Sequence, residues 1–414
     1  MSISSSLYSG ISGLNTNGNA MSVIGNNIAN TNTIGFKSSR TVFSDLLSAN
    51  IAGSGGNSQV GRGTGLSTVD NIFAQGTFES TTSNTDLAIE GEGMFVVREP
   101  GNTTQYYTRA GAFRFDGDGY LVNPEGFRVQ GRSFNASGEL SAGDASDVRV
   151  NINSAIPANM TANMALTTNL DANSAEVSGP FDIDDPTTYN YASSTTVYDS
   201  LGNTHLLTTY FSRVPAVAPA AHTWQYNVVD ENNAVVATEV LNYDTNGEQS
   251  GGTGTTTISG LDWGNGTATQ DIVFTLNTTQ YANDSQVLSQ DQDGYGPGSL
   301  MKISIDETGT VTANYSNGER IRVSQIVLAK FANFNGLVKQ GQNLFSATDA
   351  AGPPRIGVPG PELGNLFTNA LEQSTVDLAA EFVKMITTQR GFQANSRVIT
   401  TTDEMLGELI NLKR

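Results

Sequence analysis

The chain has 414 residues, which at roughly 100–200 residues per domain suggests two to four domains. Hydrophobic residues make up 37% and charged residues 15%, and the chain carries a formal net charge of −19 and no cysteine. The acidity argues against nucleic acid and anionic membranes as partners, and the lack of cysteine excludes disulfides, catalytic thiolates and thiolate metal sites.

The excess acid belongs to the body of the chain. Residues 1–50 hold two basic residues and one acidic residue, and residues 371–414 hold five basic and six acidic ones. The start, MSISSSLYSG, has neither the basic nor the apolar segment of a cleavable signal peptide, and no apolar run approaches the length of a membrane span. We therefore expect no membrane insertion and no cleaved signal peptide.

The first predicted element is an uncharged helix within residues 1–30. Leu7, Leu14, Met21 and Ile28 recur every seven residues, with Ile24 on the same flank, and such an apolar stripe indicates a helix. The helix also contains several glycines, each of which costs about 0.5–1 kcal/mol relative to alanine. Such a helix should be unstable alone, so we expect it to be buried against neighbouring backbones.

The middle of the chain is predicted to be β structure. Residues 300–331 alternate apolar and polar positions around two turns, DETG at 306–309 and SNG at 316–318, and Asn-Gly between alternating segments is a strong hairpin signal. Similar patterns run through 94–132. The stretch 170–290 holds further strands between Gly- and Asn-rich loops, which indicates a separate β domain.

The chain is predicted to end in a second amphipathic helix. A 4-3 series from Leu378 to Ile410 is apolar at seven of its ten positions, and most charged residues of this segment, though not Asp403, fall off the stripe. The stripes of the two terminal helices could pair within one molecule, between molecules, or both, and we favour packing between chains. The predicted assembly interface consists of Leu7, Leu14, Met21, Ile24, Ile28, Leu378, Phe382, Met385, Phe392, Ile399, Leu406 and Ile410.

The predicted fold is a mainly β body with α-helical termini, arranged as concentric insertions. A terminal helical assembly domain comprises 1–30 and 372–414, and connectors comprise 31–75 and 353–371. A first β domain comprises 76–155 and 288–352, and an outer β domain of 156–287 is inserted into it.

No residue pattern predicts catalysis or a cofactor. His205 and His222 lack the spacing of a zinc site, and no nucleophile-elbow motif is present. The Asp-rich turns at 116–119 and 291–294 lack the twelfth-position Glu of an EF-hand loop. The sequence therefore predicts no catalytic, cofactor-binding or metal-binding residue, and no enzyme.

Two terminal motifs resemble a known family. The segment IGNNIANTNTIGFK at 24–37 resembles the N-terminal signature of the flagellar rod, hook and hook-junction axial family, with Asn26, Asn27 and Asn30 as turn and cap residues, Gly35 at a tight bend, Phe36 as an anchor, and then Lys37. The segment 371–397 is similar to the family's C-terminal motif, and 86–97 and 107–131 are similar to its first β domain.

Within that family, 194–211 and 291–331 resemble the hook branch, whose members carry a large inserted domain. The resemblance implies a self-assembling helical tube, a flexible universal joint that transmits torque from motor and rod to filament. It implies a homopolymer with further partners in a distal rod protein, a hook cap protein, a hook-filament junction protein and the type III export apparatus, and an extracellular place in the flagellum. Alternatives are a distal rod or junction protein, a secreted β-rich adhesin and, third, an enzyme.

Overall fold

The computed structural model describes residues 3–47, 49–53, 56–135, 138–152, 155–216, 220, 222–251 and 254–412. The chain divides into two compact units. The terminal unit comprises Met1–Asn153, Ile303–Ala313 and Ile321–Arg414, and the inserted unit comprises Ser154–Lys302 and Asn314–Arg320. The mainly β fold with helical termini and an insertion is therefore confirmed.

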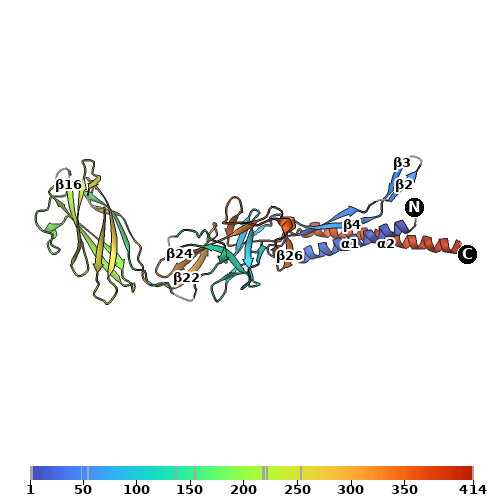
Figure 1. Ribbon diagram of the computed structural model, residues 1–414, viewed down its shortest axis with the longest axis horizontal. Coiled ribbons are helices and arrows are strands. Elements are labelled where there is room, and N and C mark those ends of the chain that lie inside the picture. Colours follow the sequence, from blue (N-terminus) through green and yellow to red (C-terminus); the bar gives the residue numbers. More distant parts are fainter. Residues whose placement is uncertain are drawn as a thin grey trace. The chain divides into compact units, whose positions relative to one another are not determined.

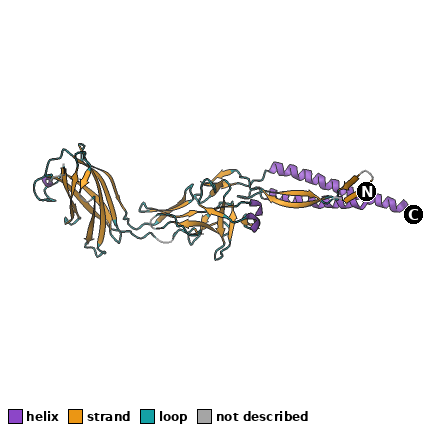
Figure 2. Cartoon of the chain, turned by 45° about the horizontal axis from the view of Figure 1, so that its top comes forward, coloured by secondary structure: helices purple, strands orange, loops and turns teal. Residues whose placement is uncertain are grey.

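Both predicted terminal helices are present in the terminal unit. Helix α1 runs from Ile3 to Ala29 and helix α2 from Leu378 to Leu412. They lie side by side, blue and red in Figure 1, so that both chain ends come to the same end of the pair, and Figure 2 agrees. Asp377 begins α2 as a cap, because its carboxylate accepts hydrogen bonds from the amides of Ala379 and Ala380 at 2.9 and 3.1 Å. No helix in the described ranges is long and apolar enough to cross a membrane.

The β structure of the terminal unit consists of one large sheet and several two-stranded ribbons. The ribbons pair β1 (Ser39–Asp45) with β4 (Thr64–Asn71), β2 (Ala49–Gly53) with β3 (Gly56–Val60), β6 (Leu87–Glu90) with β29 (Asn365–Thr368), and β5 (Phe78–Ser80) with β30 (Ala370–Glu372). Each of the last two ribbons pairs a strand from the first quarter of the chain with a strand that lies shortly before α2. These pairings attach the C-terminal segment to the β body immediately before α2 begins.

Several strands of the large sheet contribute side chains to a core of the terminal unit. Its path is β22 (Leu300–Ile305), β23 (Thr310–Tyr315), β24 (Arg320–Ile326), β11 (Arg128–Ser133), β7 (Met94–Arg98), β8 (Gln105–Thr108), β27 (Leu344–Ser346) and β26 (Val338–Gly341), and β9 (Arg114–Phe115), β10 (Leu121–Val122), β12 (Ser146–Asp147), β25 (Leu328–Lys330) and β28 (Arg355–Gly357) pair at its sides. Strand β7 is buried almost throughout and contributes Met94 and Val96 to a core shared with Tyr107 and Phe331.

The predicted turns in 300–331 are confirmed. Strands β22 and β23 flank the first turn, where the Gly309 amide donates to the Asp306 carbonyl at 2.9 Å. Strands β23 and β24 flank the second, where the Gly318 amide donates to the Tyr315 carbonyl at 3.1 Å. Both glycines have positive φ, 77° and 90°, a conformation that side chains disfavour. Glycine at these two positions therefore fixes the hairpins.

The inserted unit is built from two sheets around one core. One sheet has the order β14 (Tyr191–Tyr198), β15 (Thr204–Val214), β16 (His222–Val229), β17 (Val235–Tyr243) and β18 (Gln249–Gly251), and the other has β19 (Thr255–Leu261), β20 (Gln270–Tyr281), β13 (Asn163–Asp171) and β21 (Gln286–Gln292). Burial alternates along β20, as in a strand with one buried face. Trp224 and Tyr226 from the first sheet join Phe274 and Leu276 from the second in the core.

Candidate assembly surface

The two terminal helices are held in one antiparallel register. The Asn27 amide nitrogen at the end of α1 donates to the Glu381 carboxylate near the start of α2 at 3.2 Å. Further along, Gly13 faces Asn395 and Gly10 faces Ile399. Because the paired residue numbers sum to about 408, Met405 comes level with the first turn of α1. The last turns of α2 therefore extend past the start of α1 (Figure 1).

Small residues bring the helices close together. A Cβ added to Gly13 would lie 2.7 Å from the Asn395 side-chain amide, and one added to Gly10 would lie 3.0 Å from Ile399. The buried positions of α1 follow one helical face, and all but Ile24 have small or polar side chains; they are Gly10, Gly13, Thr16, Ala20, Ile24 and Asn27. The helices thus pair through backbone proximity, which explains why an uncharged helix tolerates these glycines.

The pairing leaves five of the twelve predicted assembly residues exposed and six half-buried. Ile24 is buried, and Leu7, Leu14, Met21, Ile28, Met385 and Ile399 are half-buried at the edges of the helix contact. Leu378, Phe382, Phe392, Leu406 and Ile410 are exposed, and Phe382 keeps half of its surface in solvent. Val383 and Ile386, outside the predicted set, are exposed as well. Large apolar side chains on a soluble surface mark contact sites, so this helix pair presents a surface suited to further chains.

The segment that follows α1 anchors the helices to the β body. Gly35 has φ +69°, and a Cβ there would lie 2.5 Å from the Ala110 amide nitrogen, so the turn requires glycine. The Gly35 amide donates to the Glu372 carbonyl at 2.8 Å, and the Thr375 amide donates to the Phe36 carbonyl at 3.1 Å. Backbone bonds therefore join the N-terminal motif directly to the residues before α2.

A buried ion cluster lies at this junction. The Lys37 Nζ is 2.7 Å from Glu372 Oε1, and Arg109 Nη1 is 3.3 Å from Glu372 Oε2, and the exposed fraction of each of the three side chains is 3% or less. The Gly76 amide and the Ala74 carbonyl complete the cluster, at 2.8 Å from Glu372 and 2.6 Å from Lys37. The N-terminal motif, the first β segment and the C-terminal motif thus meet at a single carboxylate.

Burial and pairing oppose each other in this cluster. Burial lowers the pKa of Lys37, and the neighbouring Glu372 carboxylate counteracts that effect. The same two causes act on Arg109, whose pKa is also lowered by burial. Removing one partner would leave an uncompensated buried charge, and this is what makes such a pair costly to break.

Beside the cluster, the side chain of Asn27 forms a second connection between α1 and the β body. Its side-chain amide nitrogen donates to the Ser39 carbonyl at 2.7 Å, and its oxygen accepts from the Ser39 amide at 3.0 Å. Through the additional bond to Glu381, Asn27 links α1, β1 and α2. A buried asparagine with satisfied donors and acceptor fixes the angle at which the helix leaves the β body.

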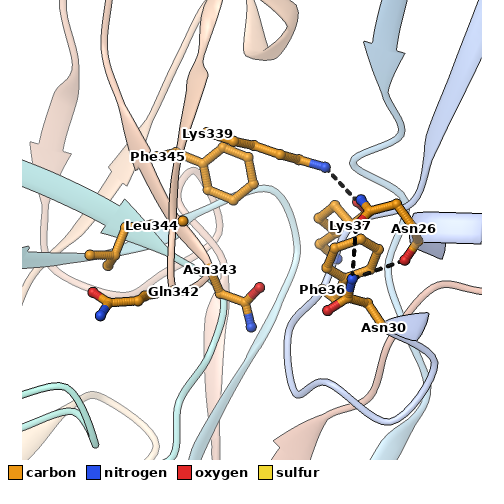
Figure 3. A pocket seen from close by; sticks show the side chains of 10 residues that line it. Asn26, Asn30, Phe36, Lys37, Lys339, Gln342, Asn343, Leu344 and Phe345 are labelled. Atoms are coloured by element: carbon orange, nitrogen blue, oxygen red, sulfur yellow. Dashed lines mark hydrogen bonds between the residues drawn. The ribbon is translucent and has the colours of Figure 1, made fainter. Parts of the chain in front are cut away.

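A cavity of about 220 Å³ adjoins this junction (Figure 3). Asn26, Asn30 and Phe36 face Asn343 and Phe345 across it. Lys339 reaches over Phe36, with Nζ 4.9 Å from the ring centroid, and donates to the Ser39 hydroxyl at 2.8 Å and the Lys37 carbonyl at 3.2 Å. The Asn343 side chain donates to the Ile34 carbonyl at 2.9 Å. The motif residues Asn26, Asn30 and Phe36 therefore pack the α1 end against the 339–345 loop.

Both histidines make side-chain contacts within the inserted unit. His205 stacks on Trp263 at 4.1 Å, with its ring nitrogens 2.9 Å from Glu231 Oε1 and 3.2 Å from Asp199 Oδ2. His222 Nδ1 lies 3.2 Å from the Arg213 guanidinium. Among the residues that the structure describes, no group of three or more carboxylates, histidines or cysteines is arranged to hold a metal ion.

Sequence reasoning did not identify the partners of the motif residues. Glu372, Arg109 and Glu381 complete the anchor, and Asn395 completes the helix contact. One signal was present: Lys37 is the first charged residue of the chain, and a lone charge after an uncharged helix calls for an opposite partner. The partner is 335 positions away, beyond the reach of any local pattern.

Four flagellar family profiles match the chain in order. They are described as flagella basal body rod protein at residues 7–37, flagellar hook protein FlgE/F/G D1 domain at 88–171, flagellar basal body protein FlaE D2 domain at 169–295, and flagellar basal body rod FlgEFG protein C-terminal at 368–412. The matches cover the α1 motif, both β regions and α2.

Full-length relatives share the same description. The chain is 37% identical to the flagellar hook protein FlgE of Borreliella burgdorferi, with 99% of each chain covered. It is 34% identical to FlgE of Salmonella typhimurium and 33% identical to FlgE of Escherichia coli, with 97% of this chain and 98% of each relative covered. A crystal structure of Helicobacter pylori flagellar hook protein FlgE2 shares the fold, with a TM-score of 0.54, 16% identity, and coverage of 71% of this chain and 99% of that one.

Proposed function

This chain belongs to the flagellar hook protein family, and we propose that its copies assemble through α1 and α2 into the helical tube of the hook, a flexible joint between rod and filament. It is a structural subunit of the flagellar axis. One observation carries the assembly proposal. Small residues already form the contact between α1 and α2 within the subunit, and large apolar side chains of the same helices remain exposed to solvent.

The apolar surface of the helix pair and the acidic surface of the β bodies are suited to different kinds of contact between subunits. Burial of apolar surface yields roughly 25 cal/mol per Å², so the helices supply the strong contacts between subunits. The acidic β bodies meet through wetter contacts that lengthen and shorten as the tube bends. Torque would pass from the helices to the β body through the buried cluster of Lys37, Glu372 and Arg109.

The finer points predicted from the sequence stand as part of this proposal. They include the bounds of the concentrically inserted domains and a role without catalysis. They also include export through the type III apparatus without a cleaved signal, and contacts with rod, cap and junction proteins. The two carboxylates at His205 are compatible with the last point, because both ring nitrogens are engaged in bonds that hold the fold of the inserted unit together.

Assembly of the purified chain tests the proposal. We expect the full-length protein to form tubes above a critical concentration, visible by electron microscopy. Val383→Asp with Ile386→Asp should abolish the tubes while the β bodies remain folded, because both side chains are exposed in the subunit. A matched control, Leu288→Asp, places the same change at an exposed site of the inserted unit and should still assemble. Tubes from the double variant would refute assembly through the helices.

A further inference from the structure

An open groove lies between α1 and the two segments that follow β1 and precede β4. Its volume is about 630 Å³, and it is lined by Ser5, Tyr8, Ile11 and Asn15 on one side and by Leu46, Leu47 and Arg62 on the other. The walls are fixed, because the Thr64 amide donates to the Ser12 hydroxyl of α1 at 3.2 Å. Tyr8 is 68% and Leu47 89% exposed, so the groove is apolar and uncovered.

The lining of the groove includes one charged side chain, that of Arg62. Within the described residues no carboxylate forms an ion pair with it. Helix α1 carries no charge of its own. An occupant should therefore be apolar along most of its length and should carry a carboxylate at one point.

The exposed end of α2 has these properties. Thr401, Glu404, Met405, Glu408 and Asn411, which recur about every three or four residues along one side of the helix with Glu404 and Met405 adjacent, line a shallow hollow. Met405 is 60% exposed, and neither glutamate takes part in an ion pair among the described residues. Gly407, with open space around its Cα, lets a neighbouring surface come close.

The two surfaces also match in length. Thr401–Asn411 and Ser5–Asn15 each span ten residue steps of an α-helix, or about 15 Å. They are different patches of the same chain, with no lining residue in common. A contact between two different patches is heterologous, and it generates a ring or, where the rotation does not close, an open helical polymer, rather than a two-fold dimer.

We propose that the α1 groove of one subunit holds the C-terminal turns of α2 from a second copy, with Arg62 facing Glu404 or Glu408. This inference rests on the assembly proposed above and adds its direction and its residues. Each subunit then gives a helix end to one neighbour and receives one from another.

Cysteine cross-linking tests the contact in the full-length chain. The protein contains no cysteine, so any cross-link in Leu47→Cys/Met405→Cys is defined. After assembly and brief exposure to a mild oxidant or a short bismaleimide, we expect a ladder of dimers, trimers and longer chains on a denaturing gel. Either single variant should stop at dimers or below. Tubes that give no ladder, or that give only an intramolecular cross-link, would overturn the proposed contact and leave helix-mediated assembly intact. Failure of the unmodified chain to form tubes would count against the assembly proposal itself.

Charge reversal gives an independent measurement should the cysteine variant fail to assemble. We expect Arg62→Glu to raise the critical concentration for assembly several-fold, and the triple variant Arg62→Glu/Glu404→Arg/Glu408→Arg to restore it. The same change at another exposed arginine, Arg40→Glu in β1, should shift it less. Equal effects of the two single changes, or no rescue in the triple variant, would contradict the pairing.

Discussion

The Lys37 ammonium lies 2.7 Å from the Glu372 carboxylate, and neither side chain is exposed to solvent. The pair joins the residue that follows the N-terminal motif to the residue that precedes α2. Because Arg109 binds the second carboxylate oxygen, the β body takes part as well. The stability of the terminal unit should therefore depend on this pair more than on any exposed ion pair.

Replacing Lys37 by Met should destabilise the terminal unit. Breaking a buried pair by removing one partner costs about 3–5 kcal/mol, since the remaining charge is left uncompensated. Both tryptophans, Trp224 and Trp263, lie in the inserted unit. In urea unfolding, the circular-dichroism transition should move to lower urea while the tryptophan-fluorescence transition keeps its midpoint.

The exposed pair of Arg40 and Asp70 supplies the matched control. Its atoms are 3.7 Å apart and the arginine is 64% exposed, so Arg40→Met should cost no more than about 1 kcal/mol. Equal losses for the two substitutions would show that the buried cluster is not a principal anchor of the terminal unit.

The glycines of α1 should differ sharply in their tolerance of a methyl group. Gly13→Ala places a Cβ against the Asn395 amide, which itself donates to the Gly391 carbonyl at 3.0 Å, so the helices must separate or Asn395 must give up that bond. Overpacking of this kind costs about 1–3 kcal/mol. Limited proteolysis followed by mass spectrometry should show faster loss of both chain ends.

Gly18 provides the comparison, because a Cβ there meets no atom within 4 Å. Gly18→Ala should raise the stability of α1 by up to about 1 kcal/mol through helix propensity and should slow cleavage of the ends. A Gly13 variant that resists proteases as well as the Gly18 variant does would show that the close helix contact is unimportant in the subunit.

Apolar side chains on the two helices should matter for polymerisation more than for folding. Phe392→Asp and Leu14→Asp should abolish tube formation, since each places a charge on the surface proposed to lie between subunits. The tryptophan-fluorescence transition should keep its midpoint, because the inserted unit is untouched. Sedimentation after salt-induced assembly would measure the loss, and pelleting at the unmodified level would remove these residues from the interface.

Acid should weaken the inserted unit through Asp199. Burial by itself raises the pKa of Asp199, but hydrogen bonds from Asn203, His205 and Asn265 outweigh it and hold the pKa well below its ordinary range. A carboxylate with a lowered folded-state pKa contributes stability above its unfolded pKa of about 3.9, and this contribution is lost as the pH falls toward the folded-state value. The tryptophan-fluorescence melting temperature should therefore decrease below about pH 5.

Asp199→Asn isolates that contribution. At neutral pH we expect a loss of about 1.5–3 kcal/mol, typical of hydrogen bonds to a charged group, and a shallower decrease on acidification. Asp284→Asn, at an exposed position of the same unit, should keep the pH profile of the unmodified chain. A variant at Asp199 with an unchanged profile would assign the acid sensitivity elsewhere.

Local patterns predicted the elements well and their contacts poorly. The seven-residue spacing from Leu7 and the 4-3 series from Leu378 indicated the helices, and the turns at Gly309 and Gly318 indicated the hairpins, because these signals depend on neighbours in sequence. The face that joins α1 to α2 is instead the row of small residues around Gly13, since close backbone approach outweighs apolar bulk there. The local sequence marks Lys37 as a lone charge but does not point to Glu372, which lies 335 positions away.

Backbone hydrogen bonds bridge the two ends of the longer segment of the inserted unit, Ser154–Lys302. The Ile156 amide donates to the Gly298 carbonyl at 2.8 Å, and the Asn159 amide donates to the Tyr295 carbonyl at 2.9 Å, so the outgoing and returning chains run as a two-stranded neck. A neck of this kind makes the unit a replaceable cassette. Fluorescent proteins or epitope tags whose termini lie close together could be grafted at this neck, and evolution could enlarge or exchange the cassette there without altering the helix pair or its anchor.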